Sequence, residues 1–354
     1  MMARLEEICA INMGQSPDSS TYNEDGNGLP FFQGNADFGE IYPAVRMWCS
    51  EPTKIAREKD ILISVRAPIG ALNIANCECC IGRGLAALTV NEDICAQEYL
   101  WHALSGKVDE LNSKGTGSTF KAINKKTLSE TEIPLPPIDE QRKIAAILDK
   151  VSDLIAKRQQ QLDKLDEAVK ARFVEIFGDC YTNPHNLPIE KWNNIFSTTT
   201  GKLDSNAAVE NGKYPFFTCA KETLRINTYA FDQEALLLAG NNAAGKYDVK
   251  YYCGKFNAYQ RTYVLSLKHD WSYALFRFQL EDKLGYLEQQ SLGGLTKYLT
   301  LKILNELEFI VPPKEEQDKF AAFVDQIEKT KTTVSHSLEK LETLKKALMQ
   351  EYFR

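Results

Sequence analysis

Residues 133–178 read IPLPPIDEQRKIAAILDKVSDLIAKRQQQLDKLDEAVKARFVEIFG, and residues 309–354 read FIVPPKEEQDKFAAFVDQIEKTKTTVSHSLEKLETLKKALMQEYFR. The two stretches align without a gap at a constant offset of 176 residues. The same offset also pairs residues further upstream, as far back as residue 117. An internal repeat decides the architecture before any local pattern does. The chain is therefore a variable unit, a helix, a second variable unit and a second helix. The identical pairs are Pro136/Pro312, Pro137/Pro313, Glu140/Glu316, Gln141/Gln317, Ala145/Ala321, Ala146/Ala322, Asp149/Asp325, Leu165/Leu341 and Phe177/Phe353, and upstream Gly117/Gly293, Lys121/Lys297, Lys126/Lys302, Leu128/Leu304 and Glu132/Glu308.

Each copy of the repeat predicts a long helix that pairs with another helix. The two prolines block a helix before them, and Asp139 or Glu315 follows where negative charge suits the helix dipole. Apolar residues then recur at alternating spacings of three and four, as a coiled coil requires. Some forty residues at ~1.5 Å each make a rod of roughly 60 Å. The predicted helix-pairing residues are Leu148, Val151, Ile155, Leu162, Leu165, Val169 and Ile176 in the first copy, and Val324, Ile327, Val334, Leu338, Leu341 and Leu348 in the second.

The apolar stripe formed by these residues, the seam of the coiled coil, is interrupted by polar residues at different positions in the two copies. Arg158 corresponds to Val334, while Ile155 and Val169 correspond to Lys331 and Lys345. Because polar seam positions select register and partner, this mismatch favours pairing of the two copies with each other. A coil that joins separate chains is the alternative.

The composition is that of a folded, water-soluble protein with more than one domain. The chain has 354 residues, of which 44% are hydrophobic and 25% charged. It has no apolar run of about 18 residues and no export signal at its start, so we expect a cytoplasmic protein. The net charge of −6 argues against nucleic acid in general, but it is uneven: residues 1–138 carry −6 and residues 181–313 carry +1. A nucleic-acid surface must therefore be local or completed by partners.

The nine cysteines do not predict a disulfide scaffold or a metal site. Cys77, Cys79 and Cys80 are clustered, but no second cysteine pair lies at the spacing of a zinc finger. The chain also has only four histidines that could complete a metal site. We expect free thiols and no bound metal.

The two variable units share an outline of strands and turns. Both contain a Pro-Phe-Phe element, at residues 30–32 and 215–217. Apolar runs at 60–65 and 234–239, and again at 85–90 and 262–267, predict strands, and stretches at about 96–112 and 271–289 predict helices. We expect twisted sheets that carry a few helices.

Loops on such a scaffold are the expected ligand contacts. Arginine can bind guanine with two hydrogen bonds, Asn and Gln can bind adenine, and Lys, Ser and glycine amides can hold phosphates. Each residue alone is a weak indication, because a loop Arg or Lys is more often a solvated charge. The predicted DNA-binding residues are Arg66, Arg83, Lys114, Ser118, Lys121, Asn241, Asn242, Gln260, Arg261, Lys297 and Tyr298.

Two motifs that hint at catalysis are rejected. Residues 240–246 match most of a phosphate-binding P-loop, but Tyr247 replaces the magnesium-binding Ser or Thr, and a strand pattern follows instead of a helix. Residues 35–38, Asn-Ala-Asp-Phe, lack both prolines of the adenine-methyltransferase motif. The absence of a catalytic motif, together with the duplication, favours a binding module.

The repeated Pro-Pro-x-x-Glu-Gln, preceded by a glycine-rich loop and followed by a long helix, resembles the specificity (S) subunits of type I restriction-modification systems over essentially the whole chain. The resemblance implies an α+β fold in which two β-rich target-recognition domains are separated by an antiparallel pair of long coiled-coil helices. Each domain would read one half of a bipartite DNA site, while the helices would set the gap and dock two methyltransferase (M) subunits. Motor-nuclease (R) subunits would complete the complex. S-adenosylmethionine, ATP and Mg²⁺ would bind only the partner subunits, so this chain would itself have no catalytic residue or cofactor.

The resemblance implies recognition domains at residues 1–135 and 180–311, and spacer helices at 136–179 and 312–354. The chain is short for the family, which reduces the conserved region at its N-terminus, and Phe309-Ile310-Val311 departs from Ile-Pro-Leu before the second proline pair. Two other hypotheses stay open: a coiled-coil scaffold or adaptor without a DNA function, and an atypical DNA methyltransferase or nuclease.

Overall fold

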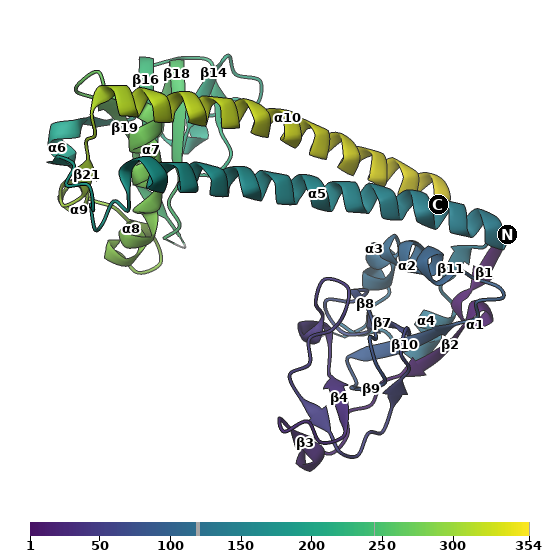
Figure 1. Cartoon of the computed structure of the whole chain (residues 1–354). Coiled ribbons are helices and arrows are strands. Elements are labelled where there is room, and N and C mark those ends of the chain that lie inside the picture. Colours follow the sequence, from purple (N-terminus) through teal and green to yellow (C-terminus); the bar gives the residue numbers. More distant parts are fainter. Residues whose placement is uncertain (118–120, 244, 354) are drawn as a thin grey trace. The chain divides into compact units, whose positions relative to one another are not determined.

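The computed structural model describes residues 1–117, 121–243 and 245–353, and the chain divides into two compact units. The first unit contains residues 1–159 and 336–354, and the second contains residues 160–335. Two helices of 40 residues, α5 (Ile138–Phe177) and α10 (Lys314–Phe353), each contribute to both units (Figure 1). Each unit is therefore a β-rich domain packed on part of both long helices.

The proline pairs lie just outside the helices and cap their first turns. The amides of Glu140 and Gln141 donate to the Pro137 carbonyl at 2.9 and 3.0 Å, and Glu316 and Gln317 bond Pro313 in the same way. The helices begin two residues later than the predicted spacer spans because the prolines supply these acceptors and have no amide hydrogen to donate.

The two long helices run antiparallel. In the first unit, Ile144 and Leu148 near the start of α5 share a core with Phe353 at the end of α10. In the second unit, Phe173 and Phe177 near the end of α5 pack edge-on against Phe320 near the start of α10, with ring centroids 5.7 Å apart. The copies of the repeat thus pair with each other within one chain, as the mismatched seam predicted.

A buried glutamine attaches each long helix to the domain beside it. The Gln141 side chain is fully buried; its oxygen accepts a 2.9 Å hydrogen bond from the Ala96 amide, and its nitrogen donates to the Pro136 carbonyl at 2.8 Å. Gln317 repeats both contacts with Ser272 and Pro312, at 2.9 and 2.8 Å. Because Ala96 and Ser272 are the N-cap residues of α2 (Gln97–Ser105) and α7 (Tyr273–Asp282), the equivalent glutamine sets how each domain docks.

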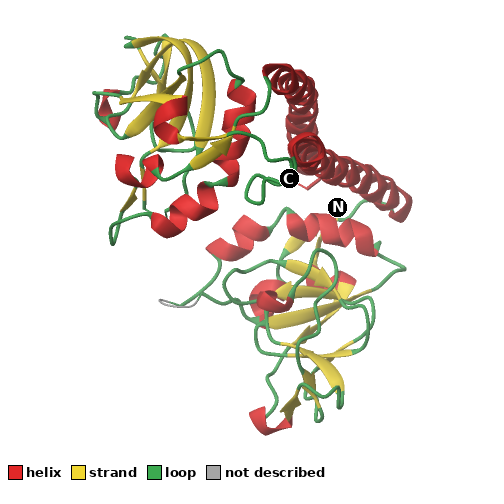
Figure 2. Cartoon of the chain, turned by 60° about the vertical axis from the view of Figure 1, so that its left-hand side comes forward, coloured by secondary structure: helices red, strands yellow, loops and turns green. Residues whose placement is uncertain are grey.

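The first unit carries the N-terminal β-rich domain, whose strands gather beside short helices (Figure 2). Its strands form a four-stranded sheet ordered β2-β10-β7-β8, a five-stranded sheet ordered β3-β5-β4-β9-β6 and the pair β1-β11. The strands are β1 (Met2–Arg4), β2 (Cys9–Met13), β3 (Tyr22–Asn23), β4 (Leu29–Phe32), β5 (Trp48–Cys49), β6 (Ile55–Ala56), β7 (Ile61–Ser64), β8 (Leu72–Ile74), β9 (Cys79–Ile81), β10 (Leu85–Val90) and β11 (Glu132–Pro134). The helices are α1 (Leu5–Ile8), α2 (Gln97–Ser105), α3 (Val108–Ser113) and α4 (Lys125–Ser129), with 3-10 turns η1 (Ser19–Thr21) and η2 (Asn35–Asp37).

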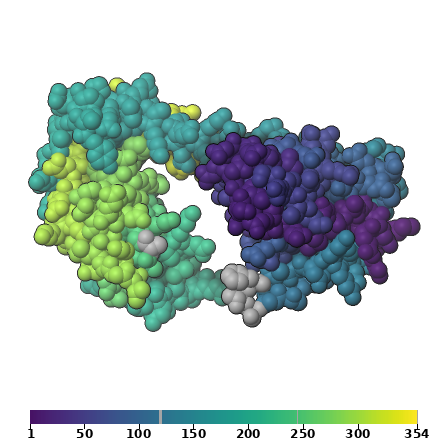
Figure 3. Space-filling model, turned by 90° about the horizontal axis from the view of Figure 1, so that it is seen from below, coloured from purple at the N-terminus to yellow at the C-terminus, as the bar shows by residue number. Residues whose placement is uncertain are grey.

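The second unit carries the other β-rich domain, whose surface is drawn mainly in green in Figure 3 and whose helices and strands share one apolar core. Its main sheet is ordered β13-β19-β16-β18-β14-β15, and β12-β21 and β17-β20 form two short pairs. The strands are β12 (Ile189–Lys191), β13 (Phe196–Thr200), β14 (Tyr214–Phe217), β15 (Leu224–Ile226), β16 (Phe231–Ala239), β17 (Asn241–Asn242), β18 (Val249–Ala258), β19 (Thr262–Leu267), β20 (Lys297–Tyr298) and β21 (Glu308–Ile310). The helices are α6 (Trp192–Ile195), α7 (Tyr273–Asp282), α8 (Leu284–Gln290) and α9 (Leu301–Asn305), with η3 (Ser205–Ala207).

The two domains are variants of one topology. Each Pro-Phe-Phe element is a strand that pairs in parallel, β4 with β9 and β14 with β18. In the second domain β18 also pairs with β16, and so joins β14 and β15 to the other strands of the six-stranded main sheet. In the first domain the corresponding strand is interrupted between Ile74 and Cys79. Its first part, β8, pairs with β7, and its second part, β9, pairs with β4. The predicted strands, helices and α+β fold class are confirmed.

Two further properties concern the described residues. None of their helices is long and apolar enough to span a bilayer. All nine cysteines lie among them without a disulfide, and burial raises the pKa of the Cys79 and Cys95 thiols to about 12, which disfavours their reactive thiolates.

The glutamine contacts predict a stability effect. Gln141→Leu or Gln317→Leu should lower the free energy of unfolding by about 1–3 kcal/mol, because a buried amide and a buried carbonyl lose their hydrogen-bond partner. Gln326→Leu, on an exposed face of α10, is the matched control and should change it by less than about 0.5 kcal/mol. Urea unfolding followed by circular dichroism measures all three, and equal effects at positions 317 and 326 would contradict the role of the buried amide.

Candidate nucleic-acid interface

Arg66 and Arg83 line one hollow of about 220 Å³ in the first unit. Arg66 follows β7 and Arg83 precedes β10, and the two strand ends are joined because the Val65 amide donates to the Gly84 carbonyl at 2.9 Å. Gly84 is required here, since a Cβ would lie 2.3 Å from the Gln33 carbonyl oxygen. The hollow thus brings together two arginines from loops that are distant in sequence.

Three other polar residues share this hollow and were missed from the sequence. Ser16, Gln33 and Asn35 line it together with the arginines, and no carboxylate is among its lining residues in the described chain. Gln33 comes directly after the Pro-Phe-Phe strand, and Asn35 is the first residue of the Asn-Ala-Asp-Phe stretch. Their position depends on the parallel pairing of β4 with β9, which no local pattern indicates.

The glycine-rich loop of the first unit folds back beside Arg66. Thr116 and Ala122 exchange backbone hydrogen bonds of 3.0 and 2.9 Å, and the Ala67 amide donates to the Lys121 carbonyl at 3.0 Å. Gly117 in this loop has φ 122°, a conformation that favours glycine. Lys114 forms an ion pair with Glu110 at 2.6 Å, which partly neutralises it, whereas predicted Ser118 lies outside the described residues.

The second unit repeats these backbone contacts at its own loops. Leu292 and Tyr298 exchange hydrogen bonds of 3.1 and 2.8 Å, just as Thr116 and Ala122 do. The Gly240 amide donates to the Arg261 carbonyl at 2.9 Å, in the role that Val65 and Gly84 have in the first unit. The predicted residues Asn241 and Asn242 pair, as β17, with Tyr298 and Lys297 of β20. Four of the six residues predicted in this unit therefore lie on a short strand pair and not on loops, and Arg261, next to Gln260, is joined to this pair through Gly240.

The shared hydrogen bonds show which loop positions correspond. Residues that follow Val65 and Gly240 are equivalent, so Arg66 corresponds to Asn241. Residues that precede Gly84 and Arg261 are equivalent, so Arg83 corresponds to Gln260, which lies 3.5 Å from Asp204. Lys121 corresponds to Lys297 at the repeat offset. One backbone arrangement thus presents arginines in one unit and amide side chains in the other.

The P-loop-like stretch leads into strand β18 and not into a helix, so it lacks the helix N-terminus that a P-loop needs. No group of three or more His, Cys, Asp or Glu side chains in the described chain is arranged to hold a metal ion.

A family model described as "Type I restriction modification DNA specificity domain" matches residues 1–167 and 191–343. The chain belongs to this family. Each matched stretch covers one β-rich domain and part of one long helix, so the chain carries the specificity domain twice.

Relatives with known names match parts of this two-domain chain. It is 44% identical over 165 residues to the "Putative type I restriction enzyme MjaX specificity subunit" of Methanocaldococcus jannaschii, over 47% of this chain and 39% of the relative. It is 36% identical over 162 residues to the "Type I restriction enzyme EcoDI specificity subunit" of Escherichia coli, over 44% of this chain and 35% of the relative. The aligned region therefore spans less than half the length of these relatives.

A solved structure matches the whole fold. The type-I restriction-modification system S subunit from M. genitalium superposes with a TM-score of 0.70 over 100% of this chain and 96% of that chain, at 14% identity. The likeness confirms the architecture of two specificity domains with long helices.

The predicted helix-pairing residues of the specificity chain all lie on the less exposed faces of α5 and α10. Leu148, Val151 and Val334 are buried and the others are partly buried. Lys331, a predicted polar interruption, forms a 2.7 Å ion pair with Asp166 of the other helix. A polar seam residue thus finds a partner across the pair, as expected where register is selected.

The close approach at Gly240 predicts a test of the loop geometry. A Cβ on Gly240 would lie 2.3 Å from the Arg261 carbonyl oxygen, whereas a Cβ on Gly294 meets nothing within 4 Å. Gly240→Ala should therefore destabilise the second unit by about 1–3 kcal/mol, and Gly294→Ala should change stability by less than about 0.5 kcal/mol. Thermal unfolding of both variants measures the difference; equal midpoints would mean that the two loops do not meet as described.

Proposed function

We propose that this chain is the sequence-specific DNA-binding subunit of a type I restriction-modification complex. Each specificity domain reads one half of a bipartite site, and the long helices set the gap between the halves. The observation that carries this proposal is that two equivalent loop positions hold different side chains, Arg66 and Arg83 in the first unit and the amides Asn241 and Gln260 in the second. Such a constant frame with changed side chains is what recognition of two different half-sites requires.

The chemistry of the two loop sets supports different base preferences. Arg66 and Arg83 favour guanine, whose O6 and N7 accept a bidentate arginine, and the absence of a lining carboxylate in the described hollow leaves their charge available. Asn241 and Gln260 favour adenine. Lys121 and Lys297, at matching positions, suit phosphates, which position a protein without selecting sequence.

The chain acts as a non-catalytic subunit in this proposal. M subunits bring S-adenosylmethionine and methylate adenine, and R subunits bring ATP and Mg²⁺ for translocation and cleavage. The net charge of −6 supports a complex in which partners neutralise many of the DNA phosphates. The helices α5 and α10 provide a stiff spacer that these partners can use as a docking surface.

Methylation mapping tests the half-site assignment. Cells that express the chain with its M subunit should carry N6-methyladenine in an asymmetric bipartite motif with a fixed gap. Arg66→Ala with Arg83→Ala should relax only the half read by the first unit, by about 1–3 kcal/mol of discrimination per base contact. Arg57→Ala, at an exposed arginine outside the hollow, is the control and should leave the motif intact. A continuous motif, or no new methylation beside an active M subunit, would favour the scaffold hypothesis.

The equivalent lysines predict a salt effect without a change of specificity. Lys121→Ala and Lys297→Ala should each weaken DNA binding by the complex about equally for matched and mismatched sites. Each should also lower the slope of log affinity against log salt by about one, because one phosphate contact is lost. Fluorescence anisotropy at several salt concentrations measures this, and a loss confined to matched sites would instead assign these lysines to base reading.

A further inference from the structure

A groove of about 760 Å³ lies within the second unit, between α7, strands β16 and β18, and the facing parts of α5 and α10. Aromatic and aliphatic side chains form much of its wall, among them Trp271, Phe278 and Val324. Its lining on α10 extends from Asp318 to Lys331, which corresponds to about 20 Å of helix. This length suits a polypeptide segment better than a small molecule.

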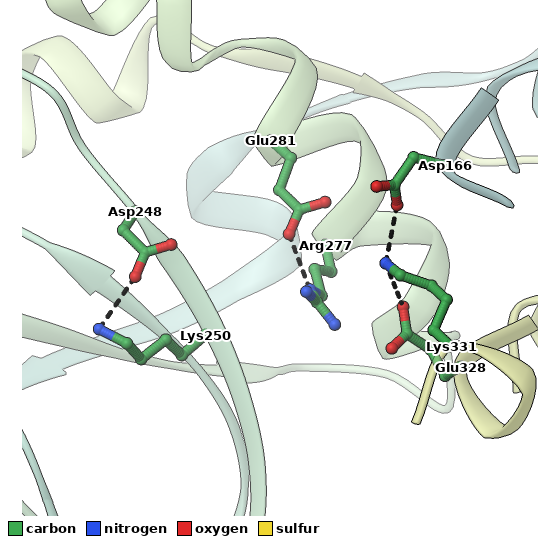
Figure 4. A network of polar contacts seen from close by, with 7 residues as sticks. All are labelled: Asp166, Asp248, Lys250, Arg277, Glu281, Glu328 and Lys331. Carbon is green, nitrogen blue, oxygen red and sulfur yellow. Dashed lines mark hydrogen bonds and ion pairs between the residues drawn. The ribbon is translucent and has the colours of Figure 1, made fainter. Parts of the chain in front are cut away.

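The groove is negatively charged. It is lined by six carboxylates and three basic side chains, and two of the basic ones already bind carboxylates inside it (Figure 4). Arg277 binds Glu281 at 2.8 Å, and Lys331 binds Asp166 at 2.7 Å and Glu328 at 3.5 Å. The carboxylates are Asp166, Glu234, Glu281, Asp318, Asp325 and Glu328.

Two of these carboxylates favour an additional cation. Burial raises the pKa of Glu281 although Arg277 opposes the shift, so its charged form is incompletely compensated. Asp325 has no ion-pair or hydrogen-bond partner within the described part of the chain. In the first unit the equivalent Asp149 accepts a 2.7 Å contact from His102. The residue equivalent to His102 is Phe278, which cannot form that hydrogen bond.

Three of the six carboxylates have no acidic equivalent in the other copy of the repeat. At the 176-residue offset, Asp318 corresponds to Arg142, while Glu281 and Glu328 correspond to Ser105 and Ser152. An occupant that recognises these carboxylates would therefore distinguish the two halves of a pseudo-symmetric chain. The charge repels the DNA backbone, so DNA is a poor candidate.

We propose that this groove docks a basic polypeptide segment of a partner protein that carries an apolar anchor. The anchor packs on Trp271, Phe278 and Val324, and Lys or Arg side chains of the segment bind Asp318, Asp325 and Glu328. Accessible carboxylates beside an apolar wall can bind both the basic and the apolar side chains of such a segment. The inference rests on the proposed function only in that a subunit of a complex has partner proteins to bind.

A fluorescein-labelled 14-residue helical peptide of lysine, alanine and leucine with one central tryptophan is the probe, and anisotropy with the full chain is the measurement. Binding should weaken with salt, and the triple variant Asp318→Asn, Asp325→Asn, Glu328→Gln should weaken it by about tenfold or more. The charge-matched control Glu92→Gln, Glu98→Gln, Glu342→Gln, at exposed sites of the first unit, should change it by less than about twofold. Equal affinity for the triple variant and the unmodified chain, or an equal loss in the control, would overturn the proposal.

A steric pair of variants keeps the test independent of charge and folding. Ala321 lines the groove, whereas its neighbour Ala322 is exposed and does not. Ala321→Trp should abolish peptide binding and Ala322→Trp should retain it, with circular dichroism to confirm that both fold; retained binding in both variants would place the peptide elsewhere and refute the proposal. Anisotropy with DNA separates this inference from the proposed function, because the groove variants should leave DNA affinity unchanged. A rise in DNA affinity without loss of peptide binding would instead make the groove a DNA-repelling surface.

Discussion

The docking of both domains depends on one buried glutamine, repeated as Gln141 and Gln317. A buried amide must satisfy both its donor and its acceptor, and each glutamine does so with a domain-helix amide on one side and a proline carbonyl on the other. The carbonyls of the following prolines, Pro137 and Pro313, accept the first amides of the long helices. The start of each helix and its contact with the domain are therefore set within one short segment. This explains why the Pro-Pro-x-x-Glu-Gln pattern persists at both positions while the surrounding sequence differs.

Around this constant attachment the two domains have diverged without changing their backbone contacts. The hydrogen bonds that hold the loops at Val65 and Gly240 are the same, yet the neighbouring side chains are Arg66 in one domain and Asn241 in the other. Backbone pairing does not depend on the side chain at an exposed loop position, so these positions can change while the fold is retained. The split of one strand into β8 and β9 in the first domain shows that even sheet continuity tolerates change outside the attachment.

The local charge of each surface differs from the net charge of the half of the sequence in which it lies. A hollow with two arginines and no carboxylate among its described lining residues lies in the more acidic half of the sequence. The acidic groove lies in the half with a nearly balanced charge. Local clustering, and not net charge, therefore decides what each face can bind. It is the basis on which we propose DNA as the ligand of the loops and a basic protein segment as the ligand of the groove beside the helices.

The sequence by itself determined the duplication, the two long helices, their seam and the strands that frame each loop, because helical and strand periodicity and an ungapped repeat are local or collinear properties. It also indicated that Arg66 and Arg83 lie outside the main strands, but Asn241 and Lys297, which it predicted in loops, lie on the short strands β17 and β20. Only the tertiary structure decided that these residues meet, that Ser16, Gln33 and Asn35 join the arginines, and that Lys114 is paired with Glu110. Those facts depend on pairing between strands far apart in the chain, such as β4 with β9, and a non-local pairing leaves no periodic mark on the residues that it brings together.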